Sequence, residues 1–547
     1  MSRARTQSHR RPAVLVVLLV VAIVAAFVAF ALRISGKSTT IGASGTVYTE
    51  AVAGQYQRIN PLYATLNDVD ADLSQLIFSG LVKLGPDGTV QPDLAALPQI
   101  SADGTVYTFK LQPHVQWQDG KPVTSADVAF TIKSLTDPDY KGDSAVAEGW
   151  LDVTVATPDE QTIVVTLKQA SAPFLARSAT VGILPQHLLA GLTAQQLFEA
   201  PFNSAPIGSG PYKLQSIDSH VATLVANNDY QPSPPHISTL KLRFYADYPS
   251  ALRALQSGEA NGLIVRDTLT EQQLTDLQKL NGMKVEQPQE GTYVVLYLNN
   301  DQAAFFADPN VRQAISLALD RQTLVQRVYF GLATPSSSPV APGSWAYAKQ
   351  YDRTTADIAQ AKKLLTAAGW VAQPTTGILV KAGQEFRFTI RTDDDPTRVA
   401  IANEIARQLD PLGIKATVAS TTFSVLRRDF LQDRKYDAAV AGWDQGPDPD
   451  PYFGWHSSQT GQAGLNLANY ANAISDDLIA KGRTVNDDVV RKDVYTQFQQ
   501  VWSQTSPSVI VAYPQYVYVH TSNLQGMDVG VLFDGSQRFS NVADWHE

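Results

Sequence analysis

The chain has 547 residues, of which 44% are hydrophobic and 17% are charged, and its formal net charge is −9. This length is too great for one hydrophobic core and predicts about three domains, while the composition is that of an ordinary globular protein. The chain contains no cysteine, so disulfides, thiol catalysis, iron–sulfur clusters and cysteine zinc sites are all excluded.

The N-terminal residues have the pattern of an export segment. Residues 1–12 carry four arginines and precede an apolar run over residues 13–32. A helical run of about 20 residues spans the hydrocarbon core of a bilayer, so we predict a transmembrane anchor with a basic cytoplasmic flank. A cleaved signal peptide is the alternative, because Ala29-Phe30-Ala31 has a small-x-small pattern. The apolar region of a signal peptide is, however, normally about 7–15 residues long.

Residues 33–45, rich in Ser, Thr and Gly, are predicted to be a flexible tether. With either an anchor or a cleaved signal, the chain beyond this tether is predicted to be extracytoplasmic. The first 44 residues contain six basic residues and no acid, so the exported part carries a net charge of about −15. An acidic ectodomain of this kind suits neither nucleic acid nor an anionic membrane surface as a partner.

The first part of the exported chain predicts a helix, a strand and a second helix. Apolar residues recur at helical spacing over 71–84 and lead to Gly80. Residues 105–111 alternate and are rich in β-branched and aromatic side chains, which predicts a strand between two tight turns. Thr124 or Ser125 can then cap a helix. The apolar face of that helix would hold Val128, Ile132 and Leu135.

The second half of the chain alternates between helices and strands. Asp308 is predicted to cap a helix that has Pro309 in its first turn and ends at Gly331. Farther on, strand, helix and strand are predicted in turn, as in a parallel α/β layer, over residues 386–391, 398–409 and 413–418. A helix and two strands follow near the C-terminus, over residues 495–502, 509–513 and 516–520.

Four segments resemble the family 5 solute-binding proteins, the extracytoplasmic receptors of peptide- and nickel-type ABC importers. The longest, residues 92–130, reads PDLAALPQISADGTVYTFKLQPHVQWQDGKPVTSADVAF. It follows the family pattern of a PxLA turn and then DGxxYTFxLRxxVxFxDGxPxTAxDVxF. The others are PIGSGPYKL at 206–214, DPNVRQAI at 308–315 and AKKLLTAAG at 361–369. The resemblance covers nearly all of residues 46–525, although this chain lacks the cysteine by which many members are lipid-anchored.

The resemblance implies an α/β fold of the two-lobed periplasmic-binding-protein type (type II, the large cluster with an extra inserted subdomain). The first lobe would comprise residues 46–290, with the inserted subdomain at about 85–200. The second lobe would comprise residues 291–490, and residues 491–547 would return to the first lobe.

The function implied is that of a receptor rather than an enzyme. Closure of the two lobes would capture a peptide outside the membrane and deliver it to an ABC permease, whose ATPase subunits are separate chains. The receptor would act as a monomer without a cofactor. A glycan, an opine or a nickel chelate stays open as the ligand, and an extracellular sensor stays open as another use of the fold.

The best candidate for a ligand-binding segment is residues 441–453. In the peptide-binding members an acid that follows a Gly-Trp pair binds the α-ammonium group of the peptide, and Gly446 occupies that position here. Asp444 or Asp448 could take this role, with Trp443 as a wall of the pocket. Asp448 and Asp450 each precede a proline and could instead only form turns.

Other candidates are more scattered. Arg391, at the end of a strand, could bind a ligand carboxylate, or could pair with one of the acids at 393–395. Tyr48 and Glu50 lie on the first strand, whose end often faces the cleft in this family. The further aromatic candidates are Trp345 and Tyr452, with Trp455 and Tyr347 as related choices. No spacing of histidines suggests a metal site.

Overall fold

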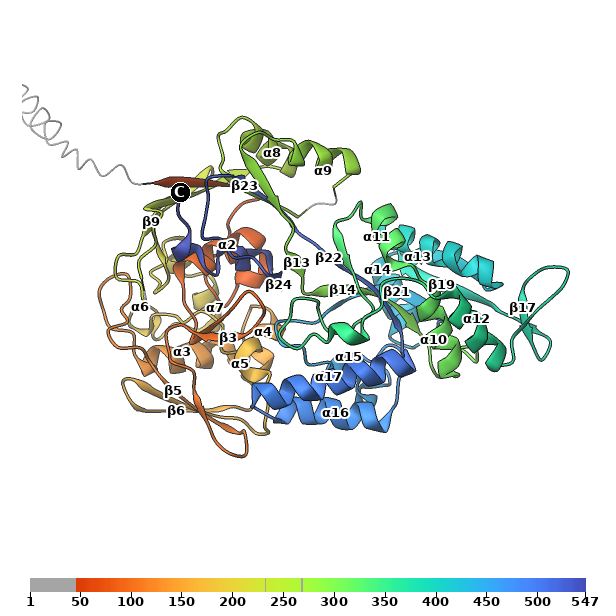
Figure 1. Cartoon of the computed structure of the whole chain (residues 1–547). Helices are drawn as coiled ribbons and strands as arrows, with labels where there is room; N and C mark the ends of the chain where they lie inside the picture. The colour runs from red at the N-terminus through yellow and green to blue at the C-terminus, as the bar shows by residue number, and fades with distance from the viewer. Residues whose placement is uncertain (1–45, 232, 267–268) are drawn as a thin grey trace, which may run out of the picture. The chain divides into compact units, whose positions relative to one another are not determined.

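The computed structural model describes residues 46–231, 233–266 and 269–547. The predicted flank, anchor and tether lie outside these residues. In the described part the chain forms two lobes, each built on its own sheet (Figure 1). None of the helices described in these ranges is both long and apolar enough to span a bilayer.

The first lobe contains a seven-stranded sheet whose central strand, β1, is parallel to both of its neighbours. Across the sheet the strands run β12 (Met283–Glu286), β23 (Val517–Thr521), β11 (Gly262–Val265), β1 (Val47–Ala53), β10 (Thr239–Tyr245), β9 (Val221–Ala226) and β8 (Tyr212–Ile217). Helices α8 (Tyr248–Gln256) and α9 (Glu271–Gln278) pack on one face of the sheet, and α2 (Asp68–Ile77) packs on the other. The sheet is therefore buried on both faces.

A smaller sheet lies within the first lobe, in the segment predicted to be an inserted subdomain. Its strands are β4 (Gln99–Ile100), β5 (Val106–Lys110), β7 (Thr162–Thr166) and β6 (Thr154–Asp159). Helix α3 (Ser125–Leu135) begins with a capping box, in which Thr124 and Asp127 each bond the backbone of the other. The predicted strand, cap and apolar helix face at this point are confirmed, because all three depend on local signals.

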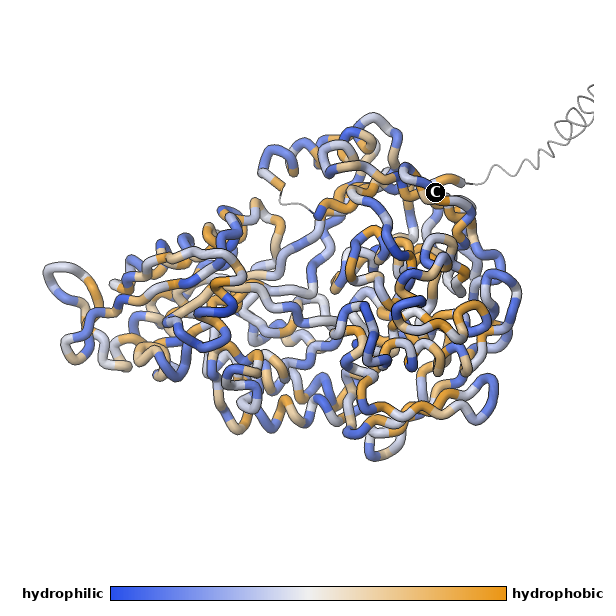
Figure 2. The backbone as a smooth tube through the Cα atoms, turned by 180° about the vertical axis from the view of Figure 1, so that it is seen from behind, coloured by the Kyte–Doolittle hydropathy of each residue, from blue (hydrophilic) through white to orange (hydrophobic). Residues whose placement is uncertain are grey.

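Short elements complete this part of the chain. The helices are α4 (Ser144–Glu148), α5 (Phe174–Arg177), α6 (Gln186–Leu189) and α7 (Ala194–Phe198), and the two-stranded sheet is β2 (Val82–Leu84) with β3 (Val90–Pro92). In Figure 2 the outer helices alternate between hydrophobic and hydrophilic residues, as expected for elements that bury one face only.

The second lobe contains a mixed six-stranded sheet, ordered β15 (Ala333–Pro335), β22 (Val509–Pro514), β14 (Thr292–Leu298), β21 (Ala438–Asp444), β19 (Arg387–Asp393) and β20 (Lys415–Thr421). Strand β14 illustrates why both faces are covered. Tyr293 and Val295 point into a cluster with Trp455 and Trp502, whereas Val294 and Leu296 belong to the opposite cluster. A strand that is apolar at every position needs helices on both sides.

Those helices form two groups. One face is covered by α10 (Pro309–Ala318), α11 (Arg321–Val328), α12 (Ile358–Ala367) and α13 (Pro396–Leu409). The other carries α15 (Tyr452–Trp455), α16 (Ala473–Thr484) and α17 (Asp488–Thr505). The remaining elements are the short helix α14 (Phe423–Val425) and a small sheet of β16 (Val371–Ala372), β17 (Leu379–Lys381) and β18 (Gln384–Glu385).

The helix predicted from Asp308 to Gly331 is in fact two helices. Leu319 adopts an extended backbone after α10, and the Asp320 side chain caps α11 by accepting from the Thr323 amide. The prediction missed this break because the apolar spacing continues across it, while Asp320 supplies a second helix start.

The chain crosses between the lobes between β12 and β14, and again between β22 and β23. At the first crossing β13 (Gln289–Glu290) pairs with β24 (Val531–Leu532), a strand of the C-terminal segment. The predicted return to the first lobe at residue 491 needs correction. Helix α17 and strand β22 both pack in the second lobe, so the chain crosses only between Pro514 and Val517. Burial of β22 between β14 and β15 explains the difference.

Candidate functional site

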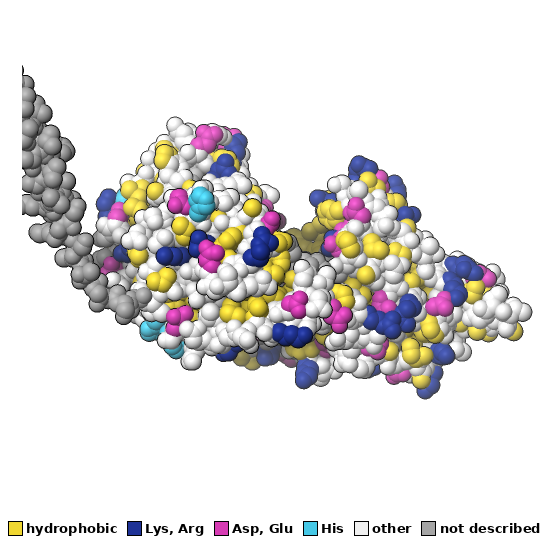
Figure 3. Space-filling model, turned by 90° about the horizontal axis from the view of Figure 1, so that it is seen from above, with side chains coloured by type: hydrophobic (Ala, Val, Ile, Leu, Met, Phe, Trp, Pro, Cys, Tyr) yellow, Lys and Arg dark blue, Asp and Glu magenta, His cyan; other side chains and the backbone are white. Residues whose placement is uncertain are grey.

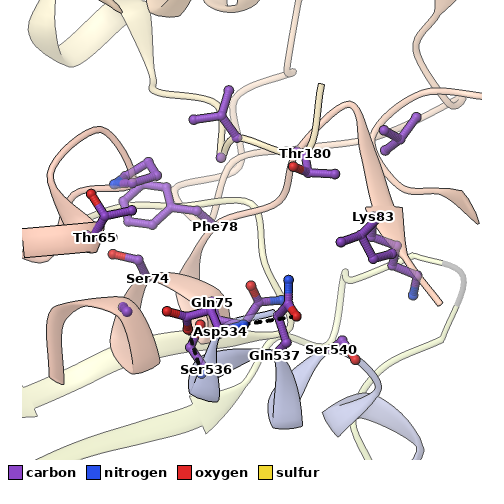
Figure 4. Close-up of a pocket in the computed structure, with 18 of the residues that line it drawn as sticks. Thr65, Ser74, Gln75, Phe78, Lys83, Thr180, Asp534, Ser536, Gln537 and Ser540 are labelled. Atoms are coloured by element: carbon purple, nitrogen blue, oxygen red, sulfur yellow. Dashed lines mark hydrogen bonds between the residues drawn. The ribbon is translucent and has the colours of Figure 1, made fainter. Parts of the chain in front are cut away.

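Two cavities lie close to the crossings between the lobes. The first, which we call the first-lobe cavity, has a volume of about 400 Å³ and lies among α2, α5, β2 and the C-terminal segment. Its polar lining comes from distant parts of the chain, with Ser74 and Gln75 on α2 and Asp534 and Gln537 near the C-terminus (Figure 4). The Ser74 hydroxyl is buried and has no hydrogen-bond partner among the described residues. This cavity therefore offers one buried hydroxyl without a partner among the described residues.

The second cavity, which we call the hinge cavity, has a volume of about 260 Å³ and is lined by both lobes and both crossings. The first lobe contributes Arg266, the crossings contribute Glu290 and Tyr516, and the second lobe contributes Tyr329 and Arg398. Figure 3, which views the molecule from the side of α8 and α9, shows a hollow between the lobes. A cavity lined in this way changes shape whenever the lobes move.

The predicted binding segment, residues 441–453, begins at the end of β21. The Trp443 ring is half-buried and lies so close to Gly454 that a Cβ there would be 3.0 Å from the ring. Asp444 is exposed, and its carboxylate accepts a hydrogen bond of 2.8 Å from the Gly446 amide. Gly446 has φ +65°, a conformation that favours glycine, so Asp444 shapes a turn that a larger residue would strain.

Asp448 is buried rather than open to a ligand. Both of its carboxylate oxygens accept hydrogen bonds from Arg491 Nη2, at 2.9 and 3.0 Å. Burial opposes the charge of Arg491, but Asp448 outweighs this and raises the pKa of the guanidinium. Asp450 lies 3.2 Å from Arg483, and burial raises the pKa of its carboxyl despite that arginine. The two acids thus attach the binding segment to α16 and α17.

The aromatic candidates pack around the same arginines. Trp345 has the guanidinium of Arg491 at 5.2 Å from its ring centroid, and Tyr452 has that of Arg483 at 4.1 Å. The structure therefore brings these two rings together with Asp448 and the binding segment, in a cluster that supports the segment from behind. Trp455 is buried against Tyr297, and Tyr347 donates to Asp352.

Arg391 forms no ion pair among the described residues. Its guanidinium stacks at 4.1 Å over the ring of Phe430, while the nearby Asp393 pairs with Arg398 instead. The alternative in which Arg391 pairs with the acids at 393–395 is therefore wrong. A stacked guanidinium keeps donors in its plane for another partner.

Tyr48 and Glu50 have no exposed surface and lie in the core of the first lobe. One Glu50 oxygen accepts from Arg538 at 3.0 Å and the other from Tyr518 at 3.0 Å. The Tyr48 hydroxyl is 3.0 Å from that of Tyr518. Burial raises the pKa of Glu50 to about 7, although Arg538 opposes the rise. These two residues lie outside both cavity linings.

Two residues that the sequence analysis did not identify stand out. Arg177, at the end of α5, donates to the backbone carbonyl oxygens of Gln445 at 3.0 Å and Asp448 at 3.4 Å in the second lobe. Nothing in the local sequence signals this contact. Glu290 lines the hinge cavity. Its place at the predicted lobe boundary, just before Gly291, was a signal that could have identified it.

Replacing Arg177 with methionine is expected to weaken contact between the lobes. The side chain is exposed, so water screens these hydrogen bonds and we expect a loss of only about 0.5–1 kcal/mol. That corresponds to a two- to fivefold shift toward more open arrangements. Small-angle X-ray scattering of the ligand-free protein should show a larger radius of gyration, and an unchanged value would contradict this role.

A comparison with family models matches residues 89–464 to the bacterial extracellular solute-binding proteins, family 5. The oligopeptide-binding protein AppA of Bacillus subtilis is 30% identical over 480 residues, which cover 86% of this chain and 87% of the relative. Protein XP55 of Streptomyces lividans is 28% identical over 519 residues, covering 92% and 91%. The chain therefore belongs to the bacterial extracellular solute-binding proteins, family 5, as the sequence motifs predict.

Solved structures agree with this assignment. Bacillus subtilis AppA in complex with a nonapeptide has a TM-score of 0.63 at 28% identity, covering 92% of this chain and 98% of that one. NikZ from Campylobacter jejuni in complex with Ni(L-His) has a TM-score of 0.66 at 26% identity, covering 92% and 99%. The predicted two-lobed fold is confirmed. Across the described ranges no group of three or more His, Asp or Glu side chains is arranged to hold a metal ion.

Proposed function

We propose that this protein is the extracytoplasmic peptide receptor of an ABC importer. The observation that carries the proposal is its similarity to the oligopeptide-binding protein AppA over most of both chains, on a fold with cavities at the junction of two lobes. Closure of the lobes surrounds the peptide, and the closed form delivers it to a permease driven by ATPase subunits on other chains. The binding protein supplies recognition, and the ATPase subunits supply the energy.

Only some of the candidate residues form part of this site directly. Trp443, half-buried, and Asp444, exposed, directly follow Gly442 of the hinge cavity, and we assign them a wall and the rim of the ligand site. Arg391, stacked on Phe430, is available to a ligand carboxylate. Asp448, Trp345 and Tyr452 act indirectly, by fixing the segment to α16 and α17.

The N-terminal sequence supports a place outside the cytoplasm. Residues 13–32 hold the protein in the membrane, residues 1–12 remain inside, and the acidic remainder works on the outer side as a monomer. Because the tether is long and polar, the lobes can reach the permease while staying close to the membrane.

Thermal unfolding of the full-length chain with pooled di- to octapeptides tests the proposal. A ligand at 100 times its Kd stabilises the folded state by about 2.7 kcal/mol, so a binding peptide raises the unfolding temperature. Sugars, opines and Ni(L-His) serve as comparison ligands, each at equal concentration. Stabilisation by one of these classes and not by peptides would contradict the proposal.

A further inference from the structure

The hinge cavity contains one acid that has no partner. Glu290 lies on β13, at the crossing from the first lobe to the second, and its backbone pairs with Leu532. Its carboxylate takes part in no hydrogen bond and no ion pair with any described residue, although the side chain is half-buried and lines the cavity. A carboxylate that is partly removed from water is costly unless something pairs with it.

The two arginines of the cavity are already paired with other acids. Arg266 lies 2.9 Å from Asp68 and 3.3 Å from Asp72. Arg398 lies 2.7 Å from Asp393 and 3.8 Å from Asp395. Each guanidinium therefore faces two carboxylates, and no positive charge of the cavity remains for Glu290.

The rest of the surroundings do not replace a counter-ion. Two phenols, Tyr329 and Tyr516, lie near the carboxylate. Burial raises the pKa of each phenol, and the charge of Glu290 adds to the rise. Thr292, Thr397, Gln515 and Asp395 also line the cavity, and Asp395 lies 3.8 Å from Arg398. Much of the remaining lining is apolar: Val265, Leu269, Val294, Val328, Leu332 and Val517. Burial alone raises the pKa of Glu290 to about 7. Among the described residues of this lining, Glu290 is thus the acid without a counter-charge.

We propose that Glu290 binds an ammonium group of the ligand in the hinge cavity. That the ligand is a peptide rests on the function proposed above. In a peptide this group is the α-ammonium, and the first side chain of the peptide lies against the apolar residues of the lining. The cavity is smaller than the roughly 300–1,000 Å³ of pockets that hold a whole ligand, so it receives one end of the molecule. Lobe closure removes water from the pair and strengthens the attraction.

The other acids near the binding segment are less suited to this role. Asp448 already shares both oxygens with Arg491, and Asp444 is exposed and bonded to the Gly446 amide. A charge pair in water is weak, whereas a pair enclosed between lobes can be strong. Gly446 occupies the position where an acid would otherwise be expected, and the other acid of the hinge cavity, Asp395, lies 3.8 Å from Arg398. Among the described residues of this cavity, Glu290 is therefore the acid that is left for a ligand.

Isothermal titration of the full-length chain with tetra-alanine and N-acetyl-tetra-alanine tests the assignment. At pH 7 we expect the free-ammonium peptide to bind at least about 30-fold tighter, and Glu290→Gln to abolish that preference. Glu271→Gln, which removes an exposed charge from the first turn of α9, is the matched control and should keep it. If the preference survives in Glu290→Gln, or is lost in Asp444→Asn instead, the assignment is overturned.

The pH dependence gives an independent signature. Below pH 7 the free Glu290 is increasingly protonated, so the affinity for tetra-alanine should fall by up to about tenfold per pH unit. Above a pH of about 8 the peptide loses its own ammonium proton, so the affinity falls again. Loss of the acid-side fall in Glu290→Gln supports the assignment, and persistence of that fall overturns it.

A second probe separates this inference from the peptide function. Butylammonium chloride carries only the ammonium and a short apolar tail. If no peptide binds, the proposed function fails. The inference still stands when butylammonium raises the unfolding temperature of the wild type and of Glu271→Gln but leaves that of Glu290→Gln unchanged. Equal effects on all three proteins, or no effect on any, overturn the inference.

Discussion

Replacing Arg538 with methionine is expected to lower the free energy of unfolding by about 3–5 kcal/mol. Arg538 is fully buried and bonds Glu50 at 3.0 Å and Asp72 at 2.7 and 2.8 Å. Without the guanidinium, two carboxylates remain buried without its charge, and only Arg266 still reaches Asp72. Urea unfolding followed by tryptophan fluorescence measures the loss.

Two further variants make the Arg538 prediction specific. Arg253→Met removes an exposed arginine of the same lobe and should change the stability by less than about 0.5 kcal/mol. A triple variant that adds Glu50→Gln and Asp72→Asn to Arg538→Met removes the uncompensated charges as well, so it should recover part of the loss. No recovery in the triple variant would mean that packing around Arg538, and not its charge, stabilises the lobe.

This charge network could not be predicted from the sequence. Glu50 and Arg538 are separated by almost the whole described chain, and nothing near either residue points to the other. The family resemblance placed Tyr48 and Glu50 on the first strand, but both faces of the sheet are buried. The sequence therefore could not tell whether Tyr48 and Glu50 face a cleft or a core.

Features with local causes were predictable. Thr124 and Asp127 are three residues apart, and their capping box follows from that spacing alone. The strand over residues 105–111 and the apolar face of the helix after it are equally local, and the four sequence motifs led to the correct family. Local propensity and motif spacing therefore predicted this strand, this cap and this helix face well.

Features that depend on which distant parts of the chain pair with one another were harder to predict from the sequence. Strand β22 has the same apolar character as β23, yet it inserts between β14 and β15 of the second lobe. Hydropathy cannot say which sheet an apolar strand joins. Arg391 illustrates the same limit, because three acids follow it closely in sequence while its actual contact is the ring of Phe430.

Asp448→Asn is the second change for which we expect a large effect, and that effect should be on stability. Arg491 is buried, and the substitution leaves its guanidinium without a counter-charge, a loss of about 3–5 kcal/mol. The second-lobe segment that follows β21 is then no longer held to α17. Urea unfolding of the variant measures this loss, and an unchanged midpoint would contradict it.

The same variant distinguishes a supporting residue from a ligand anchor. An acid that binds the peptide ammonium would, on removal, abolish the preference for tetra-alanine over its N-acetyl form. Removal of a supporting acid would weaken the binding of both peptides together and leave the ratio of their affinities unchanged, because the binding segment loosens as a whole. The double variant Asp448→Leu/Arg491→Met should restore stability, since replacing both members of a buried pair by apolar residues is often neutral. If that variant also recovers affinity for both peptides, the pair contributes to binding only by holding the segment in place.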